Sequence, residues 1–142
     1  MPVRHASAVW EGDLKNGHGK MAFGSGAFEG AYSFSSRFEE GKGTNPEELI
    51  GAAHAGCFSM ALSNILASAG FKPKRIRTNA HVRIDKVDTG FKILSVVLDT
   101  EGEVAGISQD EFQKHADSAK KGCPVSQALT GVEIKVNAIL KG

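Results

Sequence analysis

The chain has 142 residues, of which 41% are hydrophobic and 23% charged, and its net charge is +1. This composition is typical of one soluble domain with a modest core, and the near-neutral charge disfavours a nucleic-acid binder. No uninterrupted apolar run approaches the ~20 residues of a membrane span, and the N-terminus shows no apolar signal core. We therefore expect a single cytoplasmic domain over residues 1–142, with no membrane partner.

The first third of the chain predicts three strands of an antiparallel meander. Short runs with aromatic or β-branched residues are separated by glycines, which are typical of turns and bulges. The expected strands cover residues 6–11, 18–24 and 27–34. Residues 35–43 carry Arg37 and other charges, and we expect a polar loop there.

A long helix is expected to follow this loop. Thr44 and Asn45 are good N-cap residues, Pro46 fits the first turn, and Glu47 completes a Thr-x-x-Glu capping box. The helix should run to about residue 69, because Gly70 is a fitting residue just after a helix end.

The middle of this helix has no polar face. After Glu48 no charged residue occurs before Lys72, and alanine, glycine and serine surround almost the whole helix. A helix that is apolar all round is a buried one. A chain of this size has little with which to cover it, so we predict an obligate homodimer with this helix near the interface.

The second half of the chain predicts alternating strands and two helices. Strands are expected over residues 75–87, 91–104 and 132–140, and helices over 108–121 and 124–129. Ser108 and Glu111 form a second capping box. The element order is βββαββααβ, which predicts an α+β fold with a six-stranded, mainly antiparallel sheet wrapped around the long central helix.

The chain has only two cysteines, too few for a four-cysteine zinc site. Cys123 directly precedes Pro124 and follows Lys120 and Lys121, so local residues favour it as a thiolate. Cys57 lies mid-helix in apolar surroundings, which alone raise a thiol pKa. Either cysteine could equally be an inert core or loop residue.

Other polar residues have both a chemical and an ordinary interpretation. His54 precedes Cys57 by one helical turn, a spacing that permits a Cys–His dyad or a metal pair, although a structural hydrogen bond is its more common role. Arg37 could be a simple loop arginine. Glu47 could be a carboxylate that stabilises the helix start, and Glu48 could do the same.

Several stretches carry a resemblance to a known family: Trp10-Glu11-Gly12, Arg37-Phe38-Glu39, Thr44 to Leu62, Asp85-Lys86-Val87-Asp88, and Gly122 to Ser126. The chain resembles the osmotically inducible protein C family, which includes the organic hydroperoxide resistance proteins. The Arg37-Phe38-Glu39 loop makes it more similar to the osmotically inducible branch.

The resemblance implies a thiol peroxidase that reduces organic hydroperoxides, built as an intertwined homodimer. In such a dimer two long helices lie back to back, wrapped by two six-stranded sheets. Cys57 falls on the peroxidatic position and Cys123 on the resolving position, while Arg37 and Glu47 fall on the polar partners of the peroxidatic thiol. The resemblance implies no metal and no cofactor, and it suggests a lipoyl-protein dithiol as reductant.

Helix geometry adds a prediction about Glu47. It precedes Cys57 by ten residues, which is about 15 Å along a helix axis and beyond the reach of a side chain. If Glu47 serves a thiol, we predict that it serves Cys57 of the partner subunit. Whether Cys57 and Cys123 pair within one chain or across the dimer is left open.

Two other functions fit the same residues. An acyl-thioester hydrolase also needs an acidic residue near the start of a long helix wrapped by a sheet, as Glu47 could be. A non-enzymatic ligand-binding dimer would leave both thiols inert.

Overall fold

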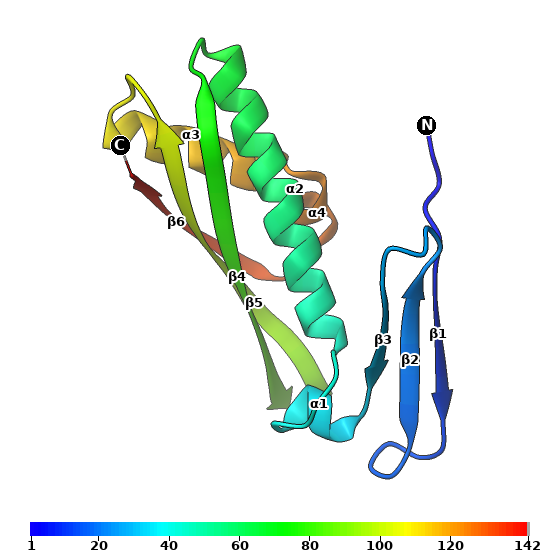
Figure 1. Ribbon diagram of the computed structural model, residues 1–142. Coiled ribbons are helices and arrows are strands. Elements are labelled where there is room, and N and C mark those ends of the chain that lie inside the picture. Colours follow the sequence, from blue (N-terminus) through cyan, green and yellow to red (C-terminus); the bar gives the residue numbers. More distant parts are fainter. Residues whose placement is uncertain (142) are drawn as a thin grey trace. The chain divides into compact units, whose positions relative to one another are not determined.

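The computed structural model describes residues 1–141 and contains two compact units, Met1–Leu49 and Ile50–Gly142. The first unit holds β1 (Ala6–Glu11), β2 (His18–Phe23), β3 (Glu29–Tyr32), α1 (Phe34–Phe38) and the first turn of α2 (Pro46–Ser68). The second unit holds the rest of α2, then β4 (Pro73–Val87), β5 (Gly90–Val104), α3 (Gln109–Gly122), α4 (Pro124–Ala128) and β6 (Glu133–Leu140). Figure 1 shows these elements in the colours of the chain order.

The first unit is a three-stranded antiparallel meander in the order β1-β2-β3, as predicted. The rings of Trp10 and Tyr32 lie 5.3 Å apart across the sheet. Gly19 sits beneath them, and a Cβ atom there would come within 2.6 Å of Tyr32 and 2.7 Å of Trp10. Only glycine therefore fits between these two rings.

A short helix, α1, begins the segment for which the sequence predicted a polar loop. Its N-terminus is closed by a reciprocal pair of serines: the Ser36 N–H donates to Ser33 Oγ, and the Ser33 N–H donates to Ser36 Oγ. This is the geometry of a capping box with serine at both positions. The loop prediction is wrong over residues 35–38, and the third predicted strand ends before Phe34, because one helical turn is too short to show a hydrophobic period.

The long helix α2 begins with a different cap from the predicted one. The Glu48 N–H donates to Asn45 Oδ1 at 2.7 Å, so Asn45 is the capping side chain and the Thr44–Glu47 capping box is wrong. The predicted end is confirmed. Gly70 has a φ of 93°, and the Phe71 N–H returns to the Leu66 carbonyl at 3.0 Å, as glycine-terminated helices do.

The second unit is a sheet in the order β4-β5-β6. Strands β4 and β5 form the predicted antiparallel hairpin, whereas β6 runs parallel to β5 after the α3 and α4 connection. The α+β class and the six strands are confirmed, but within the described chain they form two three-stranded sheets instead of one six-stranded sheet. The element order gains one helix and becomes βββααββααβ.

One stripe of α2 forms the core of the second unit. Phe58, Leu62 and Leu66 follow one another at four-residue spacing and are fully buried, together with Val96 and Leu98 of β5. Figure 1 shows α2 lying along the β4–β5 hairpin. Each such side chain contributes about 1.5–3 kcal/mol by leaving water. This packing fixes which residues of α2 face α3 and α4.

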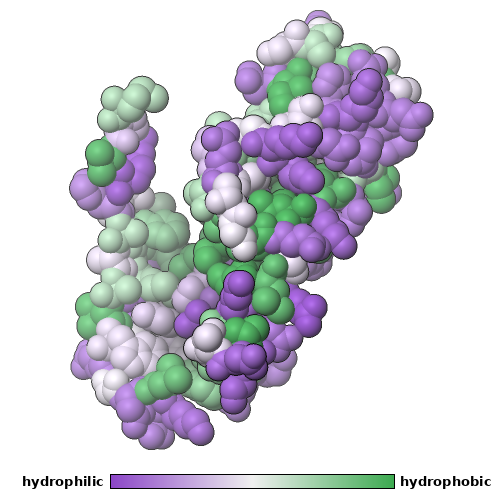
Figure 2. Space-filling model, turned by 180° about the vertical axis from the view of Figure 1, so that it is seen from behind, coloured by the Kyte–Doolittle hydropathy of each residue, from purple (hydrophilic) through white to green (hydrophobic). Residues whose placement is uncertain are grey.

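Helix α2 also has the length and composition of a membrane span, with a mean hydropathy of 1.4 over 18 residues. The sequence has no uninterrupted apolar run of ~20 residues, but the serines, glycines and histidine that interrupt α2 leave its average hydropathy as high as that of a membrane span. Its buried stripe packs in the core of the second unit. We therefore describe α2 as the core helix of a soluble protein. Figure 2 shows that apolar side chains also reach the surface of the chain.

Candidate active site

The two thiols, 66 residues apart in sequence, meet in the second unit. Cys57 lies in the middle of α2, and Cys123 lies between α3 and α4 as the residue that ends one helix and begins the next. The two sulfur atoms are 2.9 Å apart, with the Cys123 thiol positioned to donate to Cys57. Both cysteines are free, Cys123 is buried and Cys57 is half-buried. The pair lies within one chain and is ready to close into a disulfide with little movement.

The protein environment acts differently on the two thiols. Burial raises the pKa of Cys57, and the hydrogen bond with Cys123 raises it further, against a smaller lowering by the Val125 N–H. Burial also opposes ionisation of Cys123, but hydrogen bonds from Cys57 and Ser126 outweigh burial and lower the pKa of Cys123.

The two pKa shifts predict that Cys57 keeps its proton and Cys123 loses its own. The contact geometry indicates the opposite arrangement, in which Cys123 is the donor and Cys57 the acceptor. Two thiols this close titrate as a pair. We take Cys123 as the sulfur that ionises more readily within one chain, because Ser126 donates to it. The sequence suggested Lys120 and Lys121 as the stabilising cations, but hydrogen-bond donors take that role in the structure.

Arg37 and Glu47 form a two-pronged ion pair in the first unit. Arg37 Nε donates to Glu47 Oε1 and Arg37 Nη2 donates to Glu47 Oε2, both at 2.9 Å. Arg37 is carried at the end of α1 and Glu47 in the first turn of α2. The Glu47 side chain is only 7% exposed and that of Arg37 33%, so the carboxylate of this bidentate pair is shielded from solvent.

Glu48 has different partners from Glu47. Its carboxylate accepts from Thr44 Oγ1 at 2.7 Å, and its N–H donates to Asn45. The sequence left open which of the two carboxylates serves a reactive site. The structure assigns Glu47 to Arg37 and Glu48 to the start of α2.

An aromatic hollow of about 220 Å³ borders Arg37 in the first unit. Its lining is mostly apolar: Trp10, Leu14, Tyr32, Ser33, Phe34, Arg37 and Phe38. The Arg37 guanidinium carbon lies 5.2 Å from the centre of the Phe38 ring, within the range of a cation–π contact. The cation therefore lies at the edge of an apolar surface.

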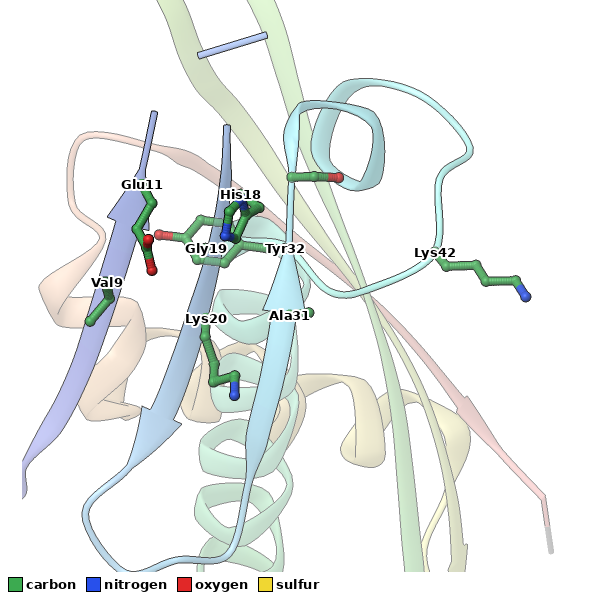
Figure 3. Close-up of a pocket in the computed structure, with 9 residues that line it drawn as sticks. Val9, Glu11, His18, Gly19, Lys20, Ala31, Tyr32 and Lys42 are labelled. Atoms are coloured by element: carbon green, nitrogen blue, oxygen red, sulfur yellow. The ribbon is translucent and has the colours of Figure 1, made fainter. Parts of the chain in front are cut away.

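A second hollow on the same sheet holds none of the predicted site residues. It has a volume of about 390 Å³, and Figure 3 shows Glu11, His18, Lys20 and Tyr32 around it. These side chains come from all three strands of the meander. The hollow is open and contains neither thiol nor the Arg37–Glu47 pair.

His54 does not form the dyad with Cys57 that its spacing permitted. It is fully buried, and its Nε2 atom lies 2.7 Å from Ser126 Oγ, on the segment that carries Cys123. Sequence reasoning missed Ser126 as a partner. The available signal was its spacing, since Ser126 follows Cys123 by three residues as Cys57 follows His54.

A metal-binding cluster is not among the features of residues 1–141, where no group of three or more His, Cys, Asp or Glu side chains could hold an ion.

Similar sequences identify the family. Residues 39–137 match the family described as OsmC-like protein. The chain is 51% identical over 139 residues to the peroxiredoxin OsmC of Escherichia coli (strain K12), which covers 97% of this chain and 96% of that protein. It is 35% identical over 91 residues to the organic hydroperoxide resistance protein OhrA of Bacillus subtilis (strain 168), covering 63% of this chain and 62% of that protein.

Solved structures share the fold. The organic hydroperoxide resistance protein OhrB of Bacillus subtilis has a TM-score of 0.75 at 23% identity, covering 94% of this chain and 97% of that one. An organic hydroperoxide resistance protein from Elizabethkingia anophelis has a TM-score of 0.76 at 25% identity, covering 99% of both chains. The α+β fold, the near full-length sequence match and the residues that carry it lead to one conclusion: the chain belongs to the OsmC-like protein family.

Proposed function

We propose that this protein is a peroxiredoxin-type thiol peroxidase that reduces organic hydroperoxides in oxidative-stress defence. The observation that carries the proposal is the contact between Cys57 and Cys123, whose sulfur atoms are 2.9 Å apart within one chain. The relative at 51% identity is named a peroxiredoxin, and other relatives are named for organic hydroperoxide resistance. A close pair of free thiols is what a two-cysteine peroxidase cycle requires.

The proposed cycle uses three balanced steps. The Cys57 thiolate attacks the terminal oxygen of ROOH; the O–O bond breaks, the leaving alkoxide takes a proton to become ROH, and Cys57 becomes a sulfenic acid. The Cys123 sulfur then attacks the Cys57 sulfur, forming a disulfide and releasing water. A dithiol reductant finally exchanges with the disulfide and is itself oxidised. The two electrons pass from the dithiol to the peroxide through sulfur alone.

Arg37 supplies the cation in this proposal. Within one chain the pKa of the Cys57 thiol is raised, chiefly by burial, whereas a peroxidatic cysteine must be a thiolate. A guanidinium beside the sulfur would reverse that shift and polarise the peroxide oxygen. The bidentate contact with Glu47 holds the guanidinium in one orientation.

Each active site is proposed to be composite. Glu47 and Cys57 stand ten residues apart on the continuous helix α2, about 15 Å along its axis, so neither Glu47 nor the arginine it holds serves the Cys57 of its own helix. Antiparallel α2 helices in a homodimer would bring Glu47 of one chain to Cys57 of the partner subunit. Residues 1–142 would then act as one functional domain whose site is completed by a second copy.

The exposed side of α2 supports such a dimer. Beside its buried stripe the helix presents small or apolar residues to solvent, including Ala53, Gly56 and the 77% exposed Met60. Small residues let two helix backbones approach closely. An apolar helix surface left in water is unfavourable for a soluble protein, and a second α2 would cover it.

The aromatic hollow beside Arg37 supports an organic substrate. Its side chains can hold an alkyl or aryl group next to the cation that polarises the peroxide, and hydrogen peroxide has no such group. We further propose a lipoyl-protein dithiol as the reductant and the cytoplasm as the location, in line with the family resemblance.

The rival functions are less well supported. An acyl-thioester hydrolase would need Glu47 as a free acid or base, whereas both of its carboxylate oxygens are engaged by Arg37. An inert ligand-binding dimer gives no reason for two free thiols to lie in contact.

Counting thiols tests the proposal. Stoichiometric cumene hydroperoxide should remove both free thiols of the chain, with cumyl alcohol as the product. Cys57→Ser should abolish peroxide consumption, and Cys123→Ser should leave a single oxidised thiol that dimedone traps as sulfenic acid. If the wild-type chain keeps both thiols after exposure to the hydroperoxide, it is not a peroxidase.

A further inference from the structure

A buried polar pair lies directly beside the two thiols. His54 and Cys57 are one turn apart on α2, and Cys123 and Ser126 have the same spacing at the start of α4. The two segments face each other, so that Cys57 contacts Cys123 at 2.9 Å and His54 contacts Ser126 at 2.7 Å. His54 is 0% exposed and Ser126 is 6% exposed. This second contact holds the Cys123 segment to α2 one turn away from the sulfur atoms.

The second ring nitrogen of His54 indicates which tautomer the ring adopts. Its Nδ1 atom is buried and has no hydrogen-bond partner within residues 1–141. Burial lowers the pKa of His54, so the ring is neutral near pH 7. An unpaired buried N–H is costlier than an unpaired lone pair, which favours the tautomer with the proton on Nε2. In that tautomer His54 donates to Ser126 Oγ, and the Ser126 hydroxyl proton is free to point elsewhere.

The Cys123 sulfur is the neighbour to which that proton can point. Ser126 occupies the third position of α4 after Cys123, and its hydroxyl and N–H both act to lower the pKa of the Cys123 thiol. The Cys123 side chain makes no capping hydrogen bond at the start of α4, so the Ser126 hydroxyl is the donor that His54 can orient toward the sulfur. Donation from the hydroxyl strengthens as negative charge develops on the sulfur.

We propose that His54 and Ser126 form a positioning pair for Cys123, in which His54 orients the Ser126 hydroxyl toward the sulfur that resolves the sulfenic acid. The inference rests on the proposed two-cysteine cycle and assigns roles within its second step. Neither residue touches the peroxide, so neither is a catalytic residue in the first step.

Disulfide formation balances without any net change in the protonation of His54 or Ser126. The Cys123 sulfur forms a bond to the Cys57 sulfur as the S–O bond of the sulfenic acid breaks. The leaving hydroxide takes up the proton that Cys123 loses, and water departs. Ser126 donates a hydrogen bond to the Cys123 sulfur while it carries charge, and His54 keeps its Nε2 proton throughout. The pair should therefore speed disulfide formation, and its loss should not slow the attack on peroxide, because a Cys123 that keeps its proton can still donate to the Cys57 thiolate.

The first test measures the ionisation of Cys123 without any peroxide. In a Cys57→Ser background the only thiol is Cys123, and its thiolate absorbance near 240 nm can be followed against pH. Ser126→Ala and His54→Ala should each raise the pKa of Cys123. Ser126→Thr and His54→Gln keep a hydroxyl and an N–H donor, and they should restore the original titration. Ser118→Ala and His81→Gln, at exposed positions, serve as matched controls.

The second test separates the two steps of the cycle in the chain with both cysteines. With stoichiometric cumene hydroperoxide, Ser126→Ala and His54→Ala should consume peroxide no more slowly than the wild type. Their sulfenic acid should persist about tenfold longer, as expected for loss of one hydrogen bond to a charged group, and be captured by dimedone. The conservative variants should return to the wild-type lifetime.

An unchanged Cys123 titration together with an unchanged sulfenic acid lifetime in both alanine variants would overturn the pairing. A slower first step in those variants would also overturn it, because the change would then be a general distortion. If no variant consumes peroxide, the proposed peroxidase function fails, yet the titration in the Cys57→Ser chain still decides whether the pair acts on Cys123.

Discussion

Glu47 and Glu48 are adjacent carboxylates with different partners, and this difference isolates the role of the Arg37 pair. Glu47 accepts both prongs of Arg37, whereas Glu48 bonds to Thr44 and to the start of α2. The two substitutions Glu47→Gln and Glu48→Gln remove the same charge from neighbouring positions. They form a matched comparison in which only one touches the guanidinium.

We expect Glu47→Gln to reduce peroxide turnover by roughly 10- to 100-fold, the range for losing a charge-assisted hydrogen bond. The pKa of the Cys57 thiolate should rise with it, because a loosely held Arg37 stabilises the anion less. Stopped-flow consumption of cumene hydroperoxide at several pH values measures both effects. Equal losses of turnover in Glu47→Gln and Glu48→Gln would show that the contact between Glu47 and Arg37 has no specific role.

His54 predicts a pH dependence of stability. Burial lowers its folded pKa below the ordinary value of 6.5, so the unfolded chain takes up a proton before the folded chain does. The stability due to neutral His54 is fully present above pH 6.5 and is lost as the pH falls through the folded pKa. The slope is at most about 1.4 kcal/mol per pH unit.

The measurement is Tm at fixed protein concentration from about pH 7.5 to about pH 5.5, where histidine titrates. The wild type should lose stability across this range, and His54→Gln should flatten the loss. Ser118→Ala changes an exposed side chain that does not titrate in this range and should leave the slope unchanged. A slope that is the same in all three proteins would show that His54 is not held neutral.

Individual residues differ in how far their sequence context predicted them. Flanking motifs identified Cys57, Cys123, Arg37 and Glu47, and the structure places them in two close pairs. Their catalytic roles remain predictions. Asn45 as the cap and Ser126 as the partner of His54 could not be predicted, because each depends on which of several suitable side chains the fold brings within hydrogen-bond distance.

At the scale of elements, the exposed side of α2 gives a direct test of the homodimer. Gly56 lies on this helix, and a Cβ atom there would meet nothing within 4 Å in the described chain. A larger side chain therefore fits a lone chain, and replacing a helical glycine stabilises the helix by about 0.5–1 kcal/mol. The same side chain would clash with a second α2 packed closely against it.

We expect Gly56→Leu to weaken the dimer by roughly 10- to 100-fold in dissociation constant, the range for overpacking a tight contact. Light scattering coupled to size-exclusion chromatography over a dilution series measures the change. Ser118→Leu, on the exposed side of α3, is the control and should leave the assembly unchanged. A Gly56→Leu protein with the wild-type mass at every concentration would argue against an interface along α2.

Long helices and strands with a clear hydrophobic periodicity were predicted well from the sequence, and short ones were not. The β4–β5 hairpin and α3 follow from alternation and from a serine cap, which the structure retains as Ser108 accepting from the Glu111 N–H. Helix α1 was missed, because its reciprocal serine cap spans a single turn. The helix propensity of five residues is too weak to predict a helix in a polar segment.

For the whole molecule, the division into two sheets is the main departure from the predicted fold. Strand counting could give six strands, but it could not tell which of them share hydrogen bonds. The β1–β3 sheet closes locally through short hairpins, while β6 joins β5 in parallel after two helices. Pairing of strands distant in sequence is decided by packing, which a sequence pattern does not contain.

The division also separates the reactive groups. Arg37 and Glu47 belong to the first unit, and Cys57 and Cys123 belong to the second. Within one chain the Cys57 thiol has a raised pKa, so in the proposed mechanism a complete site needs the cation of the Arg37–Glu47 pair. Completion by a second copy is the central claim of this account, because the continuous α2 helix keeps Glu47 away from Cys57 of the same chain.

Subunit complementation tests this claim most directly. Cys57→Ser and Glu47→Gln chains are mixed in equal amounts, unfolded and refolded together, and assayed with cumene hydroperoxide and a dithiol. In the mixed dimer one site combines an intact Cys57 from one chain with an intact Glu47 from the other. Half of randomly formed dimers are mixed, so activity should reach about a quarter of the wild-type value. Activity no greater than the average of the two variants assayed separately would contradict a composite site.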